Sequence, residues 1–245
     1  MNKGITPEHN AQARVFFARA LLLDPYSVEA LVGSALADQQ GAVSSFTDDR
    51  TARMKAAETA ATKALSLAPN HARAHSVLGS IYAFTNRVEL GIAECERALV
   101  LDRNLAYAHG GIGMAKYFIG RGVETEAHVR EALRLSPRDI YTYVWMCFAG
   151  IAKLWLGADA EAVAWLRRSV EANRNFPLAH FYLAAALAHL GVLGEARATA
   201  CAGLELHPRF TISRYHASAA CNHPAYLAGR ERTYEGLRLA GVPEG

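Results

Sequence analysis

The stretch HSVLGSIY, residues 75–82, decides the fold together with the small residues Gly91 and Ala98 that follow it. The same spacing returns along the chain when the sequence is aligned with itself. Segments that read Ala-x4-Pro, or close to it, recur at Ala20/Pro25, Ala64/Pro69, Ala98/Arg103, Ala132/Pro137, Ser169/Arg174 and Gly203/Pro208. Successive segments are 44, 34, 34, 37 and 34 residues apart. This period predicts a stack of similar structural units.

Small residues at fixed repeat positions explain how such units stack. Two antiparallel helices, A and B, approach to about 8–10 Å only where their crossing points carry small side chains. Counted from the first residue of helix A, these are Ala35, Gly79, Gly113, Cys147 and Ala184 at position 8; Ala13, Ala57, Gly91, Thr125, Ala162 and Ala196 at position 20; and Ala20, Ala64, Ala98, Ala132, Ser169 and Gly203 at position 27. Proline ends several of the B helices, because it disfavours helical dihedral angles in the residue before it. Each repeat is therefore expected to be a helical hairpin.

These residues resemble the tetratricopeptide repeat family, whose unit runs W-x2-L-G-x2-Y, then A-x3-F, then an alanine and a proline. Leu78, Gly79 and Tyr82 match that pattern, whereas His75 and Arg103 stand where the family has tryptophan and proline. The resemblance implies an all-α fold, a right-handed superhelical solenoid of helix-turn-helix repeats with a C-terminal capping helix. The implied array covers residues 1–208, with a half repeat 8–25, full repeats 28–69, 72–103, 106–137, 140–174 and 177–208, and capping helices in 209–245.

Two repeats and the N-terminal end depart from the regular unit. Repeat 28–69 carries ten extra residues around 41–51, where Ser44-Ser45 and Thr47-Asp48-Asp49 predict a loop running into a helix N-cap. Repeat 140–174 carries three extra residues, which predicts a helix A longer by nearly a turn. The half repeat has a helix B without its helix A, so we expect its apolar stripe to need a cap from an upstream part of a longer chain. That stripe is Val15, Phe16, Phe17, Leu21 and Leu22.

The C-terminal segment predicts a closing helix. Residues 225–240 follow Pro224 and precede Gly241, as is typical of the start and end of a helix. We expect an apolar side with Leu227, Tyr234 and Leu237, and a solvated side with Arg230, Glu231, Arg232, Glu235 and Arg238. Residues 210–214, 224–227 and 230–238 also look like the C-terminal end of bacterial signalling proteins in which a tetratricopeptide array follows a class III nucleotide cyclase or a winged-helix DNA-binding domain. That likeness implies a sensory or regulatory role and carries no cyclase activity.

Composition narrows the class of function. The 245 residues are 51% hydrophobic and 20% charged, which is typical of a globular chain. A formal charge of +3 does not indicate a nucleic-acid partner. The four cysteines, Cys95, Cys147, Cys201 and Cys221, lie far apart and form no CxxC motif, so we interpret them as small apolar residues of a protein in a reducing compartment. The sequence shows no secretory signal, and we therefore expect a cytoplasmic location. Residues 175–194 lack a formal charge, but their Pro, His, Gly and Ala content favours a buried helix over a membrane span.

Motifs for catalysis or metal binding give little support for an enzyme. His75, His109 and His180 share repeat position 4, but equivalent side chains in neighbouring repeats lie roughly 10 Å apart by helix packing and cannot share one zinc ion. The run 109–113, HGGIG, is like a lipase oxyanion loop, but the sequence has no GxSxG nucleophile motif. Asp48-Asp49 is more simply a helix cap than a catalytic pair. We therefore expect no enzyme activity, no cofactor and no metal.

The resemblance implies that positions 2, 5, 9, 12 and 13 of each helix A face a partner. Their aromatic and Met side chains predict an apolar groove for a peptide or helix of another protein. Family members that clamp a terminal carboxylate use Lys, Arg and Asn at these positions, and Arg73 stands almost alone here, so a clamp of that kind is disfavoured. The predicted groove residues are Arg73, Phe84, Tyr107, Met114, Tyr117, Phe118, Tyr141, Phe148, Phe181 and His189.

Three alternatives stay open at this point. The aromatic residues of the groove could instead pack one helix A against the next. The bare first helix or the groove could bind a second copy of the chain as an isologous homodimer. The array could also sense a signal for an upstream cyclase or DNA-binding domain.

Overall fold

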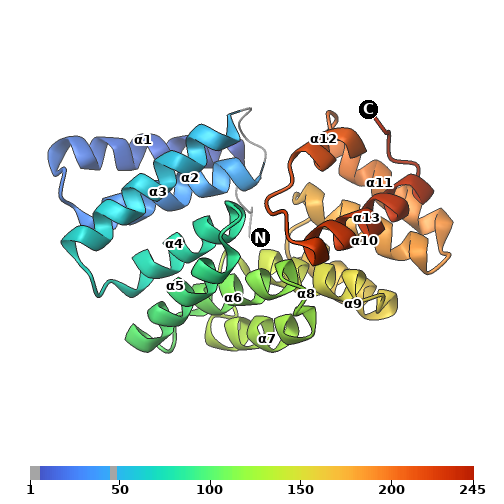
Figure 1. Ribbon diagram of the computed structural model, residues 1–245. Helices are drawn as coiled ribbons and strands as arrows, with labels where there is room; N and C mark the ends of the chain where they lie inside the picture. Colours follow the sequence, from blue (N-terminus) through green and yellow to red (C-terminus); the bar gives the residue numbers. More distant parts are fainter. Residues whose placement is uncertain (1–5, 45–48) are drawn as a thin grey trace. The chain divides into compact units, whose positions relative to one another are not determined.

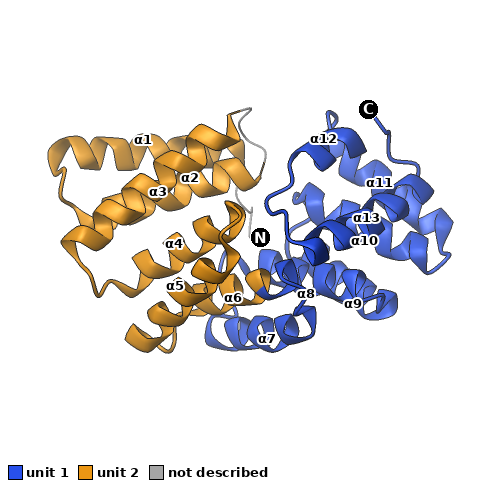
Figure 2. Cartoon of the chain, viewed as in Figure 1, with its two compact units in different colours: residues 1–4, 116–245 blue, residues 5–115 orange. Residues whose placement is uncertain are grey.

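The computed structural model describes residues 6–44 and 49–245, and these form thirteen α-helices, one short 3-10 helix and no strand (Figure 1). The all-α prediction is therefore confirmed. The chain divides into two compact units, coloured separately in Figure 2. We call residues 6–115 the N-terminal unit and residues 116–245 the C-terminal unit. The boundary between them falls within one helix, α6 (Ala106–Phe118).

The N-terminal unit is built from helices that pack pairwise in chain order. Its helices are α1 (Pro7–Leu23), α2 (Val28–Val43), α3 (Arg50–Leu67), α4 (Ala72–Phe84), α5 (Val88–Leu101) and most of α6. Helices α2 and α4 are A helices and pack against their own B helices, α3 and α5. Helix α1 packs on α2, as expected for a leading helix B.

The C-terminal unit continues the alternation of A and B helices and then ends in helices that pack differently. Its elements are the end of α6, the 3-10 helix η1 (Gly122–Glu124), α7 (Thr125–Leu135), α8 (Thr142–Trp155), α9 (Asp159–Ala172), α10 (Pro177–His189), α11 (Leu193–Leu206), α12 (Ile212–Ala217) and α13 (Pro224–Leu239). The pairs α8 with α9 and α10 with α11 are helical hairpins, whereas α13 packs on α10 and α8. The helix pairs fall inside the predicted repeat boundaries, and the boundaries themselves stay a prediction.

The small residues at the helix crossings of repeats 28–69 and 72–103 lie where the sequence predicts, whereas in α8 the close approach to α9 is at Gly150, where a Cβ would lie 2.4 Å from Leu166, and not at the predicted Cys147. Gly79 of α4 meets Gly91 of α5 so closely that a Cβ at Gly91 would lie 2.5 Å from the carbonyl oxygen of Gly79. Ala57 and Ala64 of α3 are fully buried. Close contact between helices A and B therefore depends on the absence of larger side chains at these positions.

Each of the helices α4, α6, α8 and α10 is followed by one residue in the left-handed conformation. These residues are Asn86, Gly120, Gly157 and Gly191, with φ between 63° and 79°. Glycine adopts this conformation without steric cost, and asparagine tolerates it better than most residues. Helix α13 ends in the same way at Gly241, with φ 80°, so the predicted stop signal is confirmed.

The irregular repeats differ in part from their predictions. The Asp49 side chain accepts a hydrogen bond from the Ala52 amide and caps α3, as predicted, while residues 45–48 of the loop lie outside the described residues. The prediction of a longer helix A in repeat 140–174 is wrong: α8 has 14 residues against 13 in α4 and α10. Most of the extra length enters the preceding loop instead, where Asp139 accepts a hydrogen bond from the Tyr141 amide and holds a turn.

Candidate binding face

We use the term inner face for repeat positions 2, 5, 9, 12 and 13 of the A helices within each unit. In the N-terminal unit a hydrogen-bonded network joins three A helices across this face. The Gln39 side-chain amide of α2 donates to Ser80 Oγ of α4 at 2.6 Å, and the Tyr107 hydroxyl of α6 donates to Gln39 Oε1 at 3.3 Å. These contacts place positions 12, 9 and 2 of successive A helices side by side.

The predicted residues of the N-terminal unit have different exposures. Arg73 is exposed, Phe84 and Tyr107 are half-buried, and Met114 is buried. Desolvation of the phenol raises the pKa of Tyr107 to about 12, so its hydroxyl stays protonated and available as a donor at neutral pH. The hydrogen-bonded Gln39 and Ser80 are themselves buried, so Arg73 and the half-buried rings of Phe84 and Tyr107 are the accessible residues of this set.

In the C-terminal unit the inner face is covered by the chain's own C-terminal segment, residues 209–245. The ring of Phe181, at position 5 of α10, stacks on Phe210 at 3.7 Å between centroids. At position 9, Ala185 contacts Gly236 of α13, and at position 13 the His189 ring N–H donates to the Arg232 carbonyl at 2.8 Å. Three inner positions of one helix A, 5, 9 and 13, thus contact a helix or loop of the segment.

An aromatic cluster joins α6, α8 and α13. Tyr117 lies 5.1 Å from Trp155 between ring centroids, and Phe118 lies 4.7 Å from Tyr226, both edge to face. Phe148 lies 6.1 Å from Tyr117. Tyr117 and Phe118 are buried, and desolvation raises the pKa of Tyr117 well above its ordinary value. In this unit the aromatic residues of the inner face pack on one another and on α13.

Polar contacts fix the position of α13 along the face. The Arg232 guanidinium donates to the Leu154 carbonyl at 2.8 Å and to Asp159 Oδ2 at 2.6 Å. The Trp155 indole donates to Thr233 Oγ1 at 3.0 Å. The second carboxylate oxygen of Asp159, Oδ1, is buried and has no hydrogen-bond partner within residues 6–44 and 49–245. This carboxylate has capacity for one more donor.

The solvated side predicted for the closing helix is wrong at Arg230 and at Arg232, which contacts Leu154 and Asp159. Arg230 is 3% exposed and lies over the ring of Tyr215 at 3.9 Å, and its guanidinium donates to the hydroxyls of Tyr234 and Tyr226 at 2.6 and 2.9 Å. Cation–π contacts and hydroxyl acceptors replace the water that an arginine normally keeps. Leu227, expected on the apolar side, is instead 43% exposed.

Several solved structures are similar to this architecture. The Cut9 and Hcn1 assembly of the APC/C matches with a TM-score of 0.70 over 87% of this chain at 17% identity, and this chain spans only 40% of the matched chain's length. TTC0263, a thermophilic TPR protein of Thermus thermophilus, matches with a TM-score of 0.58 at 19% identity over 83% of this chain and 99% of that one. YrrB, described as a TPR protein with an unusual peptide-binding site, matches with a TM-score of 0.50 at 26% identity over 75% and 91%. The chain has the tetratricopeptide repeat fold. No family model and no curated protein matches the sequence.

Within this tetratricopeptide fold, the predicted groove residues divide between the two units. The C-terminal unit holds Tyr117, Phe118, Tyr141, Phe148, Phe181 and His189, and the N-terminal unit holds Arg73, Phe84, Tyr107 and Met114. Tyr141 lies at the N-cap of α8. The role of all ten in binding stays a prediction.

The sequence does not predict three residues that form or contact the inner faces. Gln39 is position 12 of its repeat and could have been found by extending the register to repeat 28–69. Trp155 stands outside the register because of the three-residue insertion, and Tyr226 belongs to the C-terminal segment. No tetratricopeptide pattern signals the last two.

Two of the three aligned histidines, His75 and His180, have local structural roles. The His75 ring donates to the Pro69 carbonyl at 2.9 Å and also contacts Glu94, while the His180 ring donates to the Arg174 carbonyl at 2.9 Å. In each case the histidine bonds to the loop six residues before it. In the part of the chain that the structure describes, no group of His, Cys, Asp and Glu is arranged to hold a metal ion, and no helix is long and apolar enough to cross a membrane.

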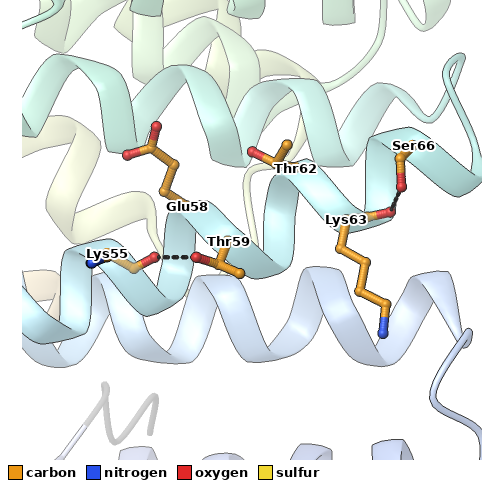
Figure 3. A pocket seen from close by; sticks show the side chains of 6 residues that line it. All are labelled: Lys55, Glu58, Thr59, Thr62, Lys63 and Ser66. Carbon is orange, nitrogen blue, oxygen red and sulfur yellow. Dashed lines mark hydrogen bonds between the residues drawn. The ribbon is translucent and has the colours of Figure 1, made fainter.

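A depression of ≈ 590 Å³ lies along α3, a helix B of the tetratricopeptide array (Figure 3). It is lined by Lys55, Glu58, Thr59, Thr62, Lys63 and Ser66. The hydroxyls of Thr59 and Ser66 donate to carbonyls of their own helix, at 2.9 and 2.8 Å. The protons of these two hydroxyls are therefore engaged within α3 itself.

Proposed function

We propose that the chain is a non-catalytic scaffold that binds an apolar peptide or helix of another protein on the inner faces of its A helices. The observation that carries this proposal is the packing of α13 on α8 and α10. Inner-face positions hold this helix through aromatic and hydrogen-bonded contacts. We call the surface that α13 occupies the seat of α13. The peptide-binding site attributed to YrrB gives further support.

The N-terminal unit is the proposed site for a partner. Arg73 is exposed on its inner face, and Tyr107 and Phe84 are half-buried at inner-face positions 2 and 13. Aromatic rings with few rotatable bonds supply contact area at low entropic cost, and the Arg73 guanidinium can donate hydrogen bonds to a partner. A sensory or regulatory role belongs to the same proposal, with the scaffold passing partner binding to a signalling domain.

Selection of helical peptides from a display library against the full chain tests this proposal. The selected peptides are expected to lose at least tenfold in affinity when Tyr107 or Phe84 is replaced by alanine, at unchanged helical content by circular dichroism. Thr62→Ala, in the depression on α3, is the matched control and is expected to leave the affinity unchanged. Peptides that bind equally well to all three variants, or no enrichment at all, would contradict the proposal.

Self-association is a second candidate function because of the exposed apolar side of α1. Val15, Phe16 and Leu22 are 54%, 67% and 83% exposed, as expected for a helix B without its helix A. Exposed apolar patches of several hundred Å² commonly mark interaction sites. Light scattering across a hundredfold concentration range distinguishes the two functions, since a chain that stays monomeric excludes a homodimer.

A further inference from the structure

Helix α13 packs on the C-terminal unit as a bound ligand would, and not as a further repeat of the array would. A helix that extended the array would pack on both members of the last hairpin, whereas α13 packs on the A helices α10 and α8. Its N-terminal end reaches α6, where Tyr226 meets Phe118. Helix α13 therefore crosses successive A helices along their inner face.

One polar atom at the contact between α13 and the hairpin of α8 and α9 is left unsatisfied. Asp159 Oδ1 is buried without a hydrogen-bond partner in the described chain, although Arg232 occupies the neighbouring oxygen. A planar guanidinium can donate to both oxygens of a carboxylate at once, and Arg232 engages only Oδ2.

The closest contacts between α13 and the A helices lie at two glycines of α13. A Cβ at Gly236 would lie 2.7 Å from the Ala185 carbonyl oxygen, and a Cβ at Gly229 would overlap the ring of Trp155. These two glycines, seven residues apart, lie on one side of α13 and let its backbone approach α10 and α8. A helix that competes for the seat needs small residues at the same spacing.

We propose that α13 is an intramolecular ligand of the C-terminal unit, and that a partner's amphipathic helix displaces it. The partner helix would carry small residues seven apart, an aromatic residue for the Phe118 and Trp155 rings, and an arginine that engages both oxygens of Asp159. This inference rests on the proposed function, because it names a second surface and a partner chemistry for the same scaffold. Its test concerns the C-terminal unit alone, so it can fail while the display experiment on Tyr107 and Phe84 succeeds.

The probe is a fluorescein-labelled synthetic peptide of residues 222–241, titrated into the full chain. In the unaltered chain the tethered α13 competes at an effective concentration on the order of millimolar, which suppresses binding of the added peptide. Gly236→Val in the chain places two methyl groups against Ala185 and is expected to release the chain's own α13. The apparent Kd of the peptide is then expected to fall at least tenfold.

Three controls make the result specific. Glu235→Val changes the exposed neighbour on the same helix and is expected to leave the peptide as weakly bound as in the unaltered chain. A peptide that itself carries Gly236→Val is expected not to bind any chain. The double variant Gly236→Val/Asp159→Asn is expected to lose most of the gain, because the peptide arginine then lacks its carboxylate.

Arg232→Ala is a second variant for the case that Gly236→Val misfolds, because it weakens the binding of α13 without a steric clash. It is expected to increase the affinity for the peptide by a smaller factor than Gly236→Val does. Equal peptide binding by Gly236→Val, Glu235→Val and the unaltered chain, all folded by circular dichroism, would overturn the proposal. So would loss of helical signal in both seat variants, which would make α13 an integral part of the unit. A dimer formed by Gly236→Val in light scattering would identify the occupant as a second copy and overturn it as well.

Discussion

Gly236 of α13 lies directly against the backbone of Ala185 in α10, at a distance that leaves no room for a Cβ atom. The contact joins the C-terminal segment to an inner-face position of the last helix A. It explains why the segment packs as a helix on the face, and it makes the seat sensitive to a single methyl group.

Gly236→Ala is expected to destabilise the chain even though alanine is the better helix former. Helix propensity favours alanine by about 1 kcal/mol, whereas the clash with Ala185 costs about 1–3 kcal/mol. Urea unfolding followed by circular dichroism measures the balance. A more stable variant would show that α13 shifts away from α10 without cost.

Gly91→Ala tests the helix crossing in the repeat 72–103. A Cβ there would meet the Gly79 carbonyl oxygen at 2.5 Å, so we expect a loss of about 2–3 kcal/mol in the free energy of unfolding. Gly194→Ala is the matched control in α11, because no atom lies within 4 Å of its Cβ position. That variant is expected to gain about 0.5–1 kcal/mol, and equal effects at the two sites would contradict the crossing geometry.

Phe118→Ala and Tyr117→Ala are each expected to cost about 3–5 kcal/mol, because both rings are buried against Trp155 or Tyr226. The melting temperature should fall clearly in each variant. An unchanged melting temperature would mean that these rings are not part of the packed cluster, and would return them to the list of residues available to a partner.

Stability should depend on pH through Glu58 and Arg87. The Arg87 guanidinium donates to both carboxylate oxygens of Glu58, at 2.7 and 2.6 Å, and this hydrogen bonding lowers the pKa of Glu58. A carboxyl whose pKa is lowered in the folded state stabilises the fold above its unfolded pKa and loses that contribution as the pH falls through the folded pKa. Because both side chains are about one third exposed, Glu58→Gln is expected to cost about 0.5 kcal/mol at pH 7.

The difference between Glu58→Gln and the unaltered chain should shrink between pH 7 and pH 3, as the pH falls toward the lowered pKa of the Glu58 carboxyl. Urea unfolding at the two pH values provides the measurement. A difference that is the same at pH 7 and pH 3 would show that the ion pair does not contribute.

The sequence predicts the hairpins well because the contacts that define them are close in the chain. Gly79 and Gly91 belong to one repeat, and the same size requirement recurs in every copy, so periodicity alone identifies it. The Asp49 cap and the Gly241 stop are local signals of the same kind.

The candidate face is less predictable because its decisive contacts are distant in sequence. The pairs Gly236 with Ala185 and Tyr226 with Phe118 join segments that no repeat pattern relates. Arg230 shows a further limit, since an arginine on a helix reads as solvated until the tyrosines around it are known. Positions 5, 9 and 13 of α10 were nevertheless assigned to the inner face from register alone, and they are the positions that contact the C-terminal segment.

Amide hydrogen exchange of the full chain tests the central claim most directly. If α13 is a ligand of the inner face, its amides exchange through a local opening that leaves α10 protected, so protection in α13 is lower than in α10 and depends less on denaturant. Equal protection of α13 and α10, with the same dependence on denaturant, would show that the two helices unfold together and would contradict a displaceable helix.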